Sequence, residues 1–495
     1  MAVSTIATTA SQDRPIEDSA HVGTVDGSRA ELVALGFFLV IALVLRLHDL
    51  GAGLWHDEIA TLIHNVRAPL GSVVTNFESQ NNHPLYSLLA KLSLLAFGDT
   101  PAALRLPAVL FGVGSIGAVY WFGLHVARPR EALTAAGLLS VSYHHVWFSQ
   151  NARAYTALLF FALIGTALCL RMCRAPLVPN RRITIAYAAV MTLALYSHLT
   201  AGVILGTHAL IWAAAALRTG QVRAAIRSGQ ATGFILAGFL SLLLYAPGLS
   251  AIATGLGGSG PKVDIAWKDP LWMIAETARG LAQGIPGGIV TLAFGALVPV
   301  VGAVDYFRRD RIATALMVLP VLITAGLLLA TAHNLWPRFF FFAGGFAVLI
   351  LVRGVFRLAR LHRRRGEVLA VGASVLLLAG SVLLLPRAYG PKQDYTGALE
   401  YVMAQRGPDD TVATVGIVGF TYQSYLGVDW PPVESEMELR NLAAAPAAVW
   451  LVYSMPELIA ARSPELWHVI ERDFRTAAVF QGTLAGGAIH VRVNR

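Results

Sequence analysis

Two acidic residues stand side by side directly after the first long apolar run. They are Asp57 and Glu58, in the segment GLWHDEIATLIHN. Adjacent residues of a helix or strand point in different directions, so the two carboxylates cannot face each other like the acid and base of a glycoside hydrolase. One would react and the other would assist. Beside Trp55 and against a membrane, partial desolvation would raise the pKa of such a carboxylate and suit it to general-base work. The alternative is that the acids cap a loop or pair with Arg67.

Two arginines also lie where later apolar runs end, on the side that the loop charges assign to the outside. Arg153 and Arg338 therefore call for an anionic partner. That partner is either a carboxylate such as Asp57 or Glu58, or a bound phosphate, whose oxygens the planar guanidinium fork matches. Three neutral side chains in the same regions would add hydrogen bonds to a phosphate: His83, Gln150 and Tyr155.

Histidines fall on the same side. A divalent metal between two of them and a carboxylate is conceivable, with His56, His198 and His333 as candidates. No HxxxH or HExxH motif is present, so an ordinary interfacial role for each histidine stays open. The sequence calls for no other cofactor.

A long loop at 250–284 begins with a glycine-rich stretch and continues into an amphipathic segment. It contains Trp267, Trp272 and Glu276. The loop could act as a mobile lid or contact an acceptor. Tryptophans near a membrane surface also serve as interfacial anchors, and that alternative stays open.

The elements that must position these residues are membrane spans. The 495 residues are 56% hydrophobic and 14% charged, with a mean hydropathy of +0.60, whereas soluble proteins have roughly 25% charged residues. Apolar segments long enough to cross a bilayer recur along the chain. Eleven are predicted, at 32–49, 106–126, 132–148, 154–170, 183–197, 199–217, 231–249, 285–304, 312–331, 338–356 and 367–386. The sequence therefore predicts a polytopic α-helical membrane protein.

The loop charges predict its orientation. Loops such as YFRRDRI and RLARLHRRRGE hold nearly all the loop arginines and are expected in the cytoplasm, so the net charge of +9 reports topology rather than nucleic-acid binding. If successive loops alternate between the two sides of the membrane, residues 84–97 must lie at the membrane interface instead of crossing. If they cross, the number of spans becomes about thirteen. Residues 1–30 are expected to form a disordered cytoplasmic tail.

Domain boundaries follow from composition. Residues 31–386 form the predicted transmembrane domain, with outer loops at 50–105 and 250–284, and residues 387–495 a soluble α/β domain outside the cytoplasm. Strands are expected at 411–418, 447–454 and 488–494, and helices at 394–406 and 464–474. This domain has no glycine-rich phosphate loop, so a sugar nucleotide is an improbable donor. Cys169 and Cys173 have no spacing that indicates a disulfide or zinc site.

With these residues assembled, the chain resembles bacterial GT-C-type membrane glycosyltransferases of family 39, the protein O-mannosyltransferase and aminoarabinose-transferase type. The resemblance rests on HDE after the first span, NNHPLYSLLAKLSLLAFGDTPAALRLPAVLFG at 81–112, WFSQNARAYTALL at 147–159, YSHLTA at 196–201 and RFFFFAGGFAVLI at 338–350. Some relatives have a doubled proline where this chain reads HPLY, and an Arg-Tyr pair where it has Arg338 and Phe339.

The resemblance implies transfer of a sugar from a polyprenyl phosphate to a lipid, glycan or protein acceptor on the extracytoplasmic face of the plasma (inner) membrane, with inversion. It makes Asp57 the base and Glu58 its partner, and puts Arg153 and Arg338 near the donor phosphate. Two alternatives remain: a flippase or transporter of a lipid-linked sugar, and a ligase that uses a pyrophosphate-linked glycan. Nothing in the sequence indicates a nucleic-acid partner.

Overall fold

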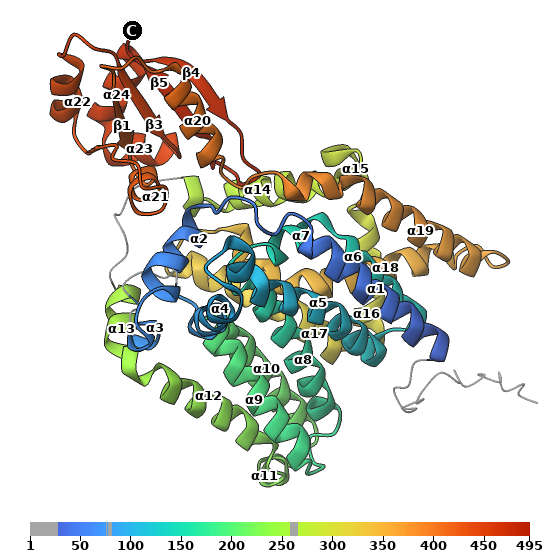
Figure 1. Cartoon of the computed structure of the whole chain (residues 1–495). Helices are drawn as coiled ribbons and strands as arrows, with labels where there is room; N and C mark the ends of the chain where they lie inside the picture. The colour runs from blue at the N-terminus through green and yellow to red at the C-terminus, as the bar shows by residue number, and fades with distance from the viewer. Residues whose placement is uncertain (1–27, 76, 78–81, 258–265) are drawn as a thin grey trace, which may run out of the picture.

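The computed structural model describes residues 28–75, 77, 82–257 and 266–495. The predicted disordered tail lies outside the described residues apart from its last three, and so does the centre of the loop 250–284. The molecule consists of a bundle of helices and an α/β domain formed by the C-terminal residues, which stands on one end of the bundle (Figure 1). This arrangement confirms the predicted fold class.

Nine helical segments of the described chain are long and apolar enough to span a membrane. Several combine two or three helices in sequence. They comprise α1 (Arg29–Leu47), α5 (Pro101–Val126), α8 (Tyr155–Arg174), α10 (Ala201–Arg218), α12 (Gln230–Tyr245) with η2 (Ala246–Gly248) and α13 (Leu249–Gly257), α15 (Gly288–Gly295) with α16 (Leu297–Arg309), α17 (Arg311–Ala330), η4 (Pro337–Ala343) with α18 (Gly344–Ala359), and α19 (Gly366–Leu384) with η5 (Leu385–Tyr389).

The two remaining predicted spans are helical but shorter. One is α9 (Arg181–Ser197), with 17 residues. The other is broken at Ser142 into α6 (Pro129–Val141) and α7 (Tyr143–Ser149), because the Ser142 side chain caps the new helix by accepting from the His145 N–H. The break exposes carbonyls at the end of α6, and the buried Arg46 guanidinium donates to those of Leu139 and Ser140. A cation within an apolar span is thereby satisfied.

Short helices fill the first outer loop. They are α2 (His56–Ala60), a single π-helical turn η1 (Thr61–Val66) that continues it, α3 (Leu70–Thr75) and α4 (Pro84–Phe97). With 14 residues, α4 is too short to span, as the alternation of loop charges requires. The other short elements are α11 (Val222–Arg227), η3 (Ala266–Lys268) and α14 (Pro270–Gln283).

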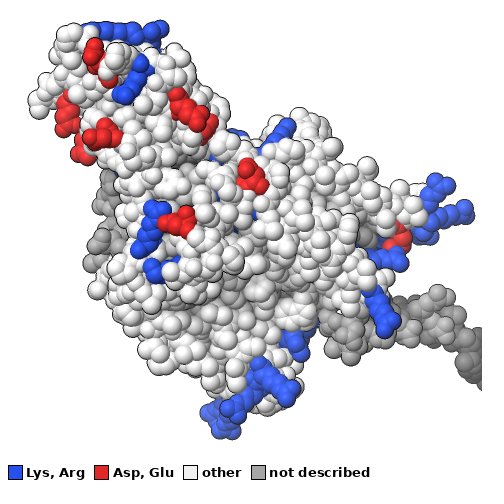
Figure 2. All heavy atoms as spheres, in the orientation of Figure 1, with Lys and Arg blue, Asp and Glu red and all other residues white. Residues whose placement is uncertain are grey.

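Ion pairs join the basic loops at the end of the bundle away from the C-terminal domain. Arg174 Nη2 lies 2.7 Å from Asp310 Oδ2, and Arg360 Nη2 lies 2.8 Å from Glu131 Oε1. On the face seen in Figure 2, groups of Lys and Arg side chains stand at the lower and right-hand ends of the bundle. The loops expected on one side of the membrane therefore lie together, and their assignment to the cytoplasm stays a prediction.

The C-terminal domain contains a five-stranded sheet in the order β2-β1-β3-β5-β4. β2 and β3 pair with β1 in parallel, and β5 is antiparallel to both β3 and β4. The strands are β1 (Thr411–Val415), β2 (Pro432–Val433), β3 (Val449–Tyr453), β4 (Arg475–Phe480) and β5 (Ile489–Val493). Two apolar clusters cover its faces, one with α20 (Tyr395–Gln405) and α21 (Val418–Ser424), the other with α22 (Glu436–Ala443), α23 (Pro456–Arg462) and α24 (Pro464–Asp473).

The carboxyl edge of the parallel strands faces the helical bundle. After β1, Phe420 of α21 packs against two rings of the first outer loop, His64 at 4.9 Å between ring centroids and His56 at 5.9 Å. After β3, Ser454 accepts from the Gln393 side chain, whose Oε1 accepts the His56 backbone N–H at 3.0 Å. Open α/β sheets bind ligands at this edge. Here the edge adjoins the segment that holds the acidic pair.

Candidate active site

Glu58 is a fully buried anchor of the first outer loop. Arg105 of α5 meets it with Nε 2.8 Å from Oε1 and Nη2 2.6 Å from Oε2. The backbone N–H of Ala152 donates to Oε1, and that of Trp55 donates to Oε2. The last contact is the return bond of a helix-capping glutamate at the third position of α2. All the acceptor directions of Glu58 are thus engaged by protein groups.

The charge of Glu58 is held by these contacts. Burial alone would raise the pKa of Glu58, but the ion pair and hydrogen bonds with Arg105 outweigh it, so the pKa lies below its ordinary value. The expectation of a raised pKa is therefore wrong for this residue. The suggested pairing with Arg67 is also wrong, because Arg67 pairs with Asp99. Glu58 is a positioning residue that fixes α2 against α5.

Asp57 points away from Glu58, as their adjacency predicts. Its Oδ2 accepts from Arg338 Nη1 at 3.3 Å, across 281 positions of sequence. The Asp57 side chain is 13% exposed and that of Arg338 is 26% exposed. The other carboxylate oxygen of Asp57 has no hydrogen bond from any described residue. Asp57 therefore satisfies the geometry of a general base better than Glu58 does.

Arg153 contacts the same turn of the first loop. Its Nη1 donates to Thr61 Oγ1 at 3.1 Å, and that hydroxyl donates to the Asp57 carbonyl at 2.8 Å. Thr61 begins the π-helical turn η1, a distortion often found at functional sites. The structure thus brings Arg153, Arg338 and Asp57 into one region, which joins the first loop to the ends of α8 and α18.

Three aromatic side chains line this region beside the arginines. His83 and His198 are stacked with ring centroids 4.8 Å apart, and Tyr155 lies 5.8 Å from His198 and 6.4 Å from His83. Burial lowers the pKa of both histidines, and the positive charges of Arg153 and Arg338 lower it further, to about 3 for His198. Both rings are therefore neutral at pH 7.

Two buried polar atoms in this cluster have no hydrogen-bond partner among the described residues. They are His83 Nε2 and Arg338 Nε. Buried polar groups are nearly always paired, so such atoms suit a ligand. Two guanidinium groups and two neutral imidazoles thus lie in one region with the Asp57 carboxylate. An anion with several oxygen acceptors fits this region.

Gln150 does not join this cluster. Its side-chain amide is buried and donates to the carbonyls of Arg46 and His48 at the end of α1. The backbone carbonyl of Gln150 accepts from the ammonium group of Lys392, at 2.7 Å. The side chain expected to contact a phosphate instead ties the loop after α7 to α1.

The histidines do not form a metal site in the described part of the chain. No three side chains of His, Cys, Asp or Glu lie close enough there to hold an ion. His198 stacks on His83, while His56 lies against Phe420. The predicted grouping of His56, His198 and His333 with a carboxylate is therefore not seen.

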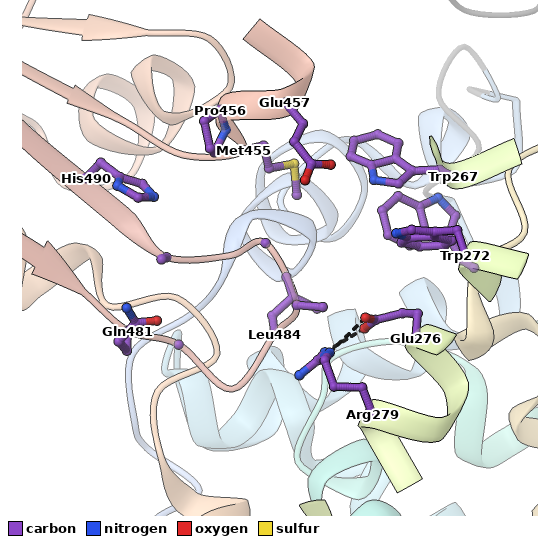
Figure 3. A pocket seen from close by; sticks show the side chains of 15 residues that line it. Trp267, Trp272, Glu276, Arg279, Met455, Pro456, Glu457, Gln481, Leu484 and His490 are labelled. Carbon is purple, nitrogen blue, oxygen red and sulfur yellow. Dashed lines mark hydrogen bonds and ion pairs between the residues drawn. The ribbon is translucent and has the colours of Figure 1, made fainter. Parts of the chain in front are cut away.

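The expected lid residues line a cavity of about 410 Å³ beneath the C-terminal domain. Figure 3 shows Trp267, Trp272 and Glu276 on one side of it and Met455, Glu457 and His490 on the other. Both tryptophans contact Trp336 and line the cavity, while their role as interfacial anchors stays a prediction.

Two residues that sequence reasoning missed connect the domains. Lys392 lies buried in the connection to the C-terminal domain, with its ammonium 5.1 Å from the Trp147 ring centroid. Burial lowers the pKa of Lys392 to about 7, against the opposing charge of Glu58. Next to it, Gln393 binds the first turn of α2. Neither residue has a local sequence signal, since their partners in the helical bundle lie more than 240 positions away.

Comparison with known proteins gives a likeness at the level of fold. No protein-family model matches the chain, and no curated protein matches it significantly. Among solved structures, ArnT from Cupriavidus metallidurans in the apo state has 13% identity and a TM-score of 0.52, covering 94% of this chain and 98% of ArnT. The Archaeoglobus fulgidus oligosaccharyltransferase, tethered with an acceptor peptide, has 12% identity and a TM-score of 0.50, covering 93% of this chain and 74% of that one. The chain has the GT-C fold of these membrane glycosyltransferases.

Proposed function

We propose that the chain transfers a sugar from a polyprenyl phosphate to an acceptor outside the cytoplasm. The observation that carries the proposal is the ion pair of Asp57 with Arg338, beside Arg153 and the neutral imidazole of His83. It combines one carboxylate suited to proton removal with two cations suited to a phosphate. The GT-C fold supports a glycosyltransferase.

The chemistry needs these groups and little more. The Asp57 carboxylate takes the proton from an acceptor hydroxyl while the hydroxyl oxygen forms a bond to the anomeric carbon. The bond from that carbon to the phosphate oxygen breaks, and the lipid phosphate leaves with the electron pair. Attack opposite to the leaving group inverts the anomeric centre. Arg338 and Arg153 stabilise the charge that develops on the departing phosphate, so no strong acid is required.

The position of the cluster supports a lipid-linked donor. It lies where α8 begins and in η4, which leads into α18, so the prenyl chain of a donor would stay among the spans while its phosphate reached the arginines. We assign the protein to the plasma membrane, with its N-terminus in the cytoplasm and with the cluster and the C-terminal domain outside. The basic loops at the opposite end support this orientation.

The deciding experiment measures transfer and donor binding on the same protein. Full-length protein in lipid nanodiscs is incubated with radiolabelled polyprenyl-phosphate sugars and native membrane extract. We expect one donor to be consumed, and Asp57→Asn to lower the rate by about 100- to 10,000-fold while donor binding persists. Asp99→Asn changes the same residue type in an exposed pair of the same loop and serves as the control.

Three results would contradict the proposal. If Asp57→Asn were as active as wild type, Asp57 could not be the general base. Movement of the labelled lipid across the bilayer, without any transfer product, would indicate a flippase instead. Consumption of pyrophosphate-linked glycans alone would indicate a ligase.

A further inference from the structure

Helix α14 has two different faces. Leu271 and Ile274 are 73% and 60% exposed and form an apolar side suited to the membrane surface. Trp272, Glu276 and Arg279 recur at helical spacing on the other side and line the cavity beneath the C-terminal domain (Figure 3). The helix is fixed by His144 Nε2, which lies 2.8 Å from the Gly280 carbonyl. The cavity face is thus held in place by the bundle.

Three tryptophans form one wall of this cavity. The ring of Trp336 lies 4.6 Å from that of Trp267, tilted by 45°, and 5.5 Å from that of Trp272, nearly perpendicular at 83°. All three indoles are partly exposed. Tilted aromatic faces that remain open to solvent bind the apolar C–H faces of a sugar ring, whereas an interior aromatic cluster would be closed.

The opposite wall comes from the carboxyl edge of the sheet. Met455, the second residue after β3, has φ of +54°, a left-handed backbone that costs energy for a residue with a side chain. It brings Pro456 and Glu457 to the cavity. His490 of β5 lies flat on Tyr453, at 5.1 Å and 7° between ring planes, which fixes its position. Strain and fixed side chains at a cavity are typical of binding sites.

The polar lining favours a neutral ligand with many hydroxyls. Glu276 and Arg279 neutralise each other in a pair joined by two hydrogen bonds, and Glu457 and Gln481 add acceptors and donors. An anionic headgroup would meet two carboxylates and one cation already paired. A lipid tail would meet polar groups on two sides. A volume of about 410 Å³ is within the range of small-molecule sites.

We propose that this cavity binds the acceptor and that the acceptor is a carbohydrate. That the bound molecule is the acceptor rests on the proposed function. That the cavity binds a carbohydrate is inferred from the residues that line it. Trp336 connects the two sites, because the Arg338 guanidinium lies 5.0 Å from its ring centroid and pairs with Asp57. A glycan held on the tryptophans lies next to the residues that position the base.

The test is direct binding without any donor, which separates it from the test of transfer. Full-length protein in nanodiscs is titrated with cellotetraose, maltotetraose, mannotetraose and chitotetraose, and binding is followed by saturation-transfer NMR. We expect at least one tetrasaccharide to bind, with affinity at least tenfold lower in Trp272→Ala. Leu271→Ala, the neighbouring residue on the opposite face of α14, is the matched control and keeps the affinity.

A second variant guards against a folding defect. Glu457→Ala removes an exposed side chain from the other wall and is expected to lower the same affinity at least threefold. The proposal is overturned if no tetrasaccharide binds, if binding is equal in Trp272→Ala, or if short peptides bind in a Trp272-dependent manner and sugars do not. If the wild-type protein binds a tetrasaccharide but shows no sugar transfer from any donor, the proposed function is contradicted and the carbohydrate site is not.

Discussion

Glu58 and Arg105 meet in a fully buried, two-pronged ion pair, with heavy-atom distances of 2.6 and 2.8 Å. Arg105 also donates to the carbonyls of Leu50, Ala52 and Gly53, so the pair fixes the whole turn between α1 and α2. The neighbouring Asp57 contacts Arg338 through one long hydrogen bond. Of the two adjacent acids, Glu58 is thus structural. Substitution of Glu58 should therefore affect stability.

We expect Glu58→Ala to destabilise the protein by about 3–5 kcal/mol, because it leaves the Arg105 charge buried and unpaired. Thermal unfolding in detergent measures the effect. Arg67→Ala breaks the exposed pair with Asp99 and should cost less than about 1 kcal/mol. Equal unfolding temperatures for Glu58→Ala and Arg67→Ala would show that the buried pair has no structural role.

The arginines should set the affinity for a lipid phosphate. A hydrogen bond to a charged group contributes about 1.5–3 kcal/mol, so Arg338→Ala and Arg153→Ala should each weaken binding of farnesyl phosphate by about 10- to 150-fold. Equilibrium binding in nanodiscs measures this. Arg387→Ala removes an exposed arginine after α19 and should leave the affinity unchanged. A uniform decrease in all three variants would indicate general charge attraction instead of a specific site.

Donor binding should take up a proton at His83. Burial and then the charge of Arg153 hold the pKa of His83 well below its ordinary value, and a bound anion would oppose that charge and raise the pKa. Affinity should therefore rise as the pH falls from 8 to 5. Farnesyl methyl phosphate is a suitable ligand because a diester keeps one charge over this range. His83→Asn should flatten the dependence and His333→Asn should not; an unchanged slope in His83→Asn would exclude His83 as the proton acceptor.

His198 should make the protein less stable in acid. Burial lowers the pKa of His198 from 6.5 to about 3 in the folded state, so the unfolded chain binds more protons between these values. Stability from the neutral ring is complete above pH 6.5 and is lost as the pH falls. Between pH 6.5 and 5 the loss is about 2 kcal/mol. Unfolding measured against pH should be flatter in His198→Asn, which keeps an acceptor for the Thr200 N–H. Parallel curves would contradict this.

The spans could be predicted because each is a long apolar run, and hydrophobic length is a strong local signal. The break at Ser142 could not, because a serine within an apolar run has no distinctive pattern. It is stabilised by Arg46, which lies more than 90 positions before the carbonyls of Leu139 and Ser140 to which it donates. The strands β2 and β4 were missed for a related reason. β2 has two residues, and β4 is an edge strand with mixed burial.

The contact of Asp57 with Arg338 could be anticipated as one of several pairings, since the alternation of spans puts both residues at the same end of the bundle. The family resemblance assigned different roles to Asp57 and Glu58, but the residues themselves gave no reason for this division, because it depends on Arg105 and on the Ala152 N–H. The sequence also did not reveal that Gln150 is occupied by the carbonyls of α1. These contacts join distant segments and depend on the packed fold.

The carboxyl edge of the sheet contacts the loop that holds Asp57 and Glu58. The two domains therefore share an interface at the boundary near residue 386, and both contribute residues to the tryptophan-lined cavity. A chimaera that replaced residues 387–495 with another α/β domain would keep the arginines and Asp57 but lose one wall of the tryptophan cavity. Such a chimaera should still bind a lipid phosphate but should lose its specificity for the acceptor.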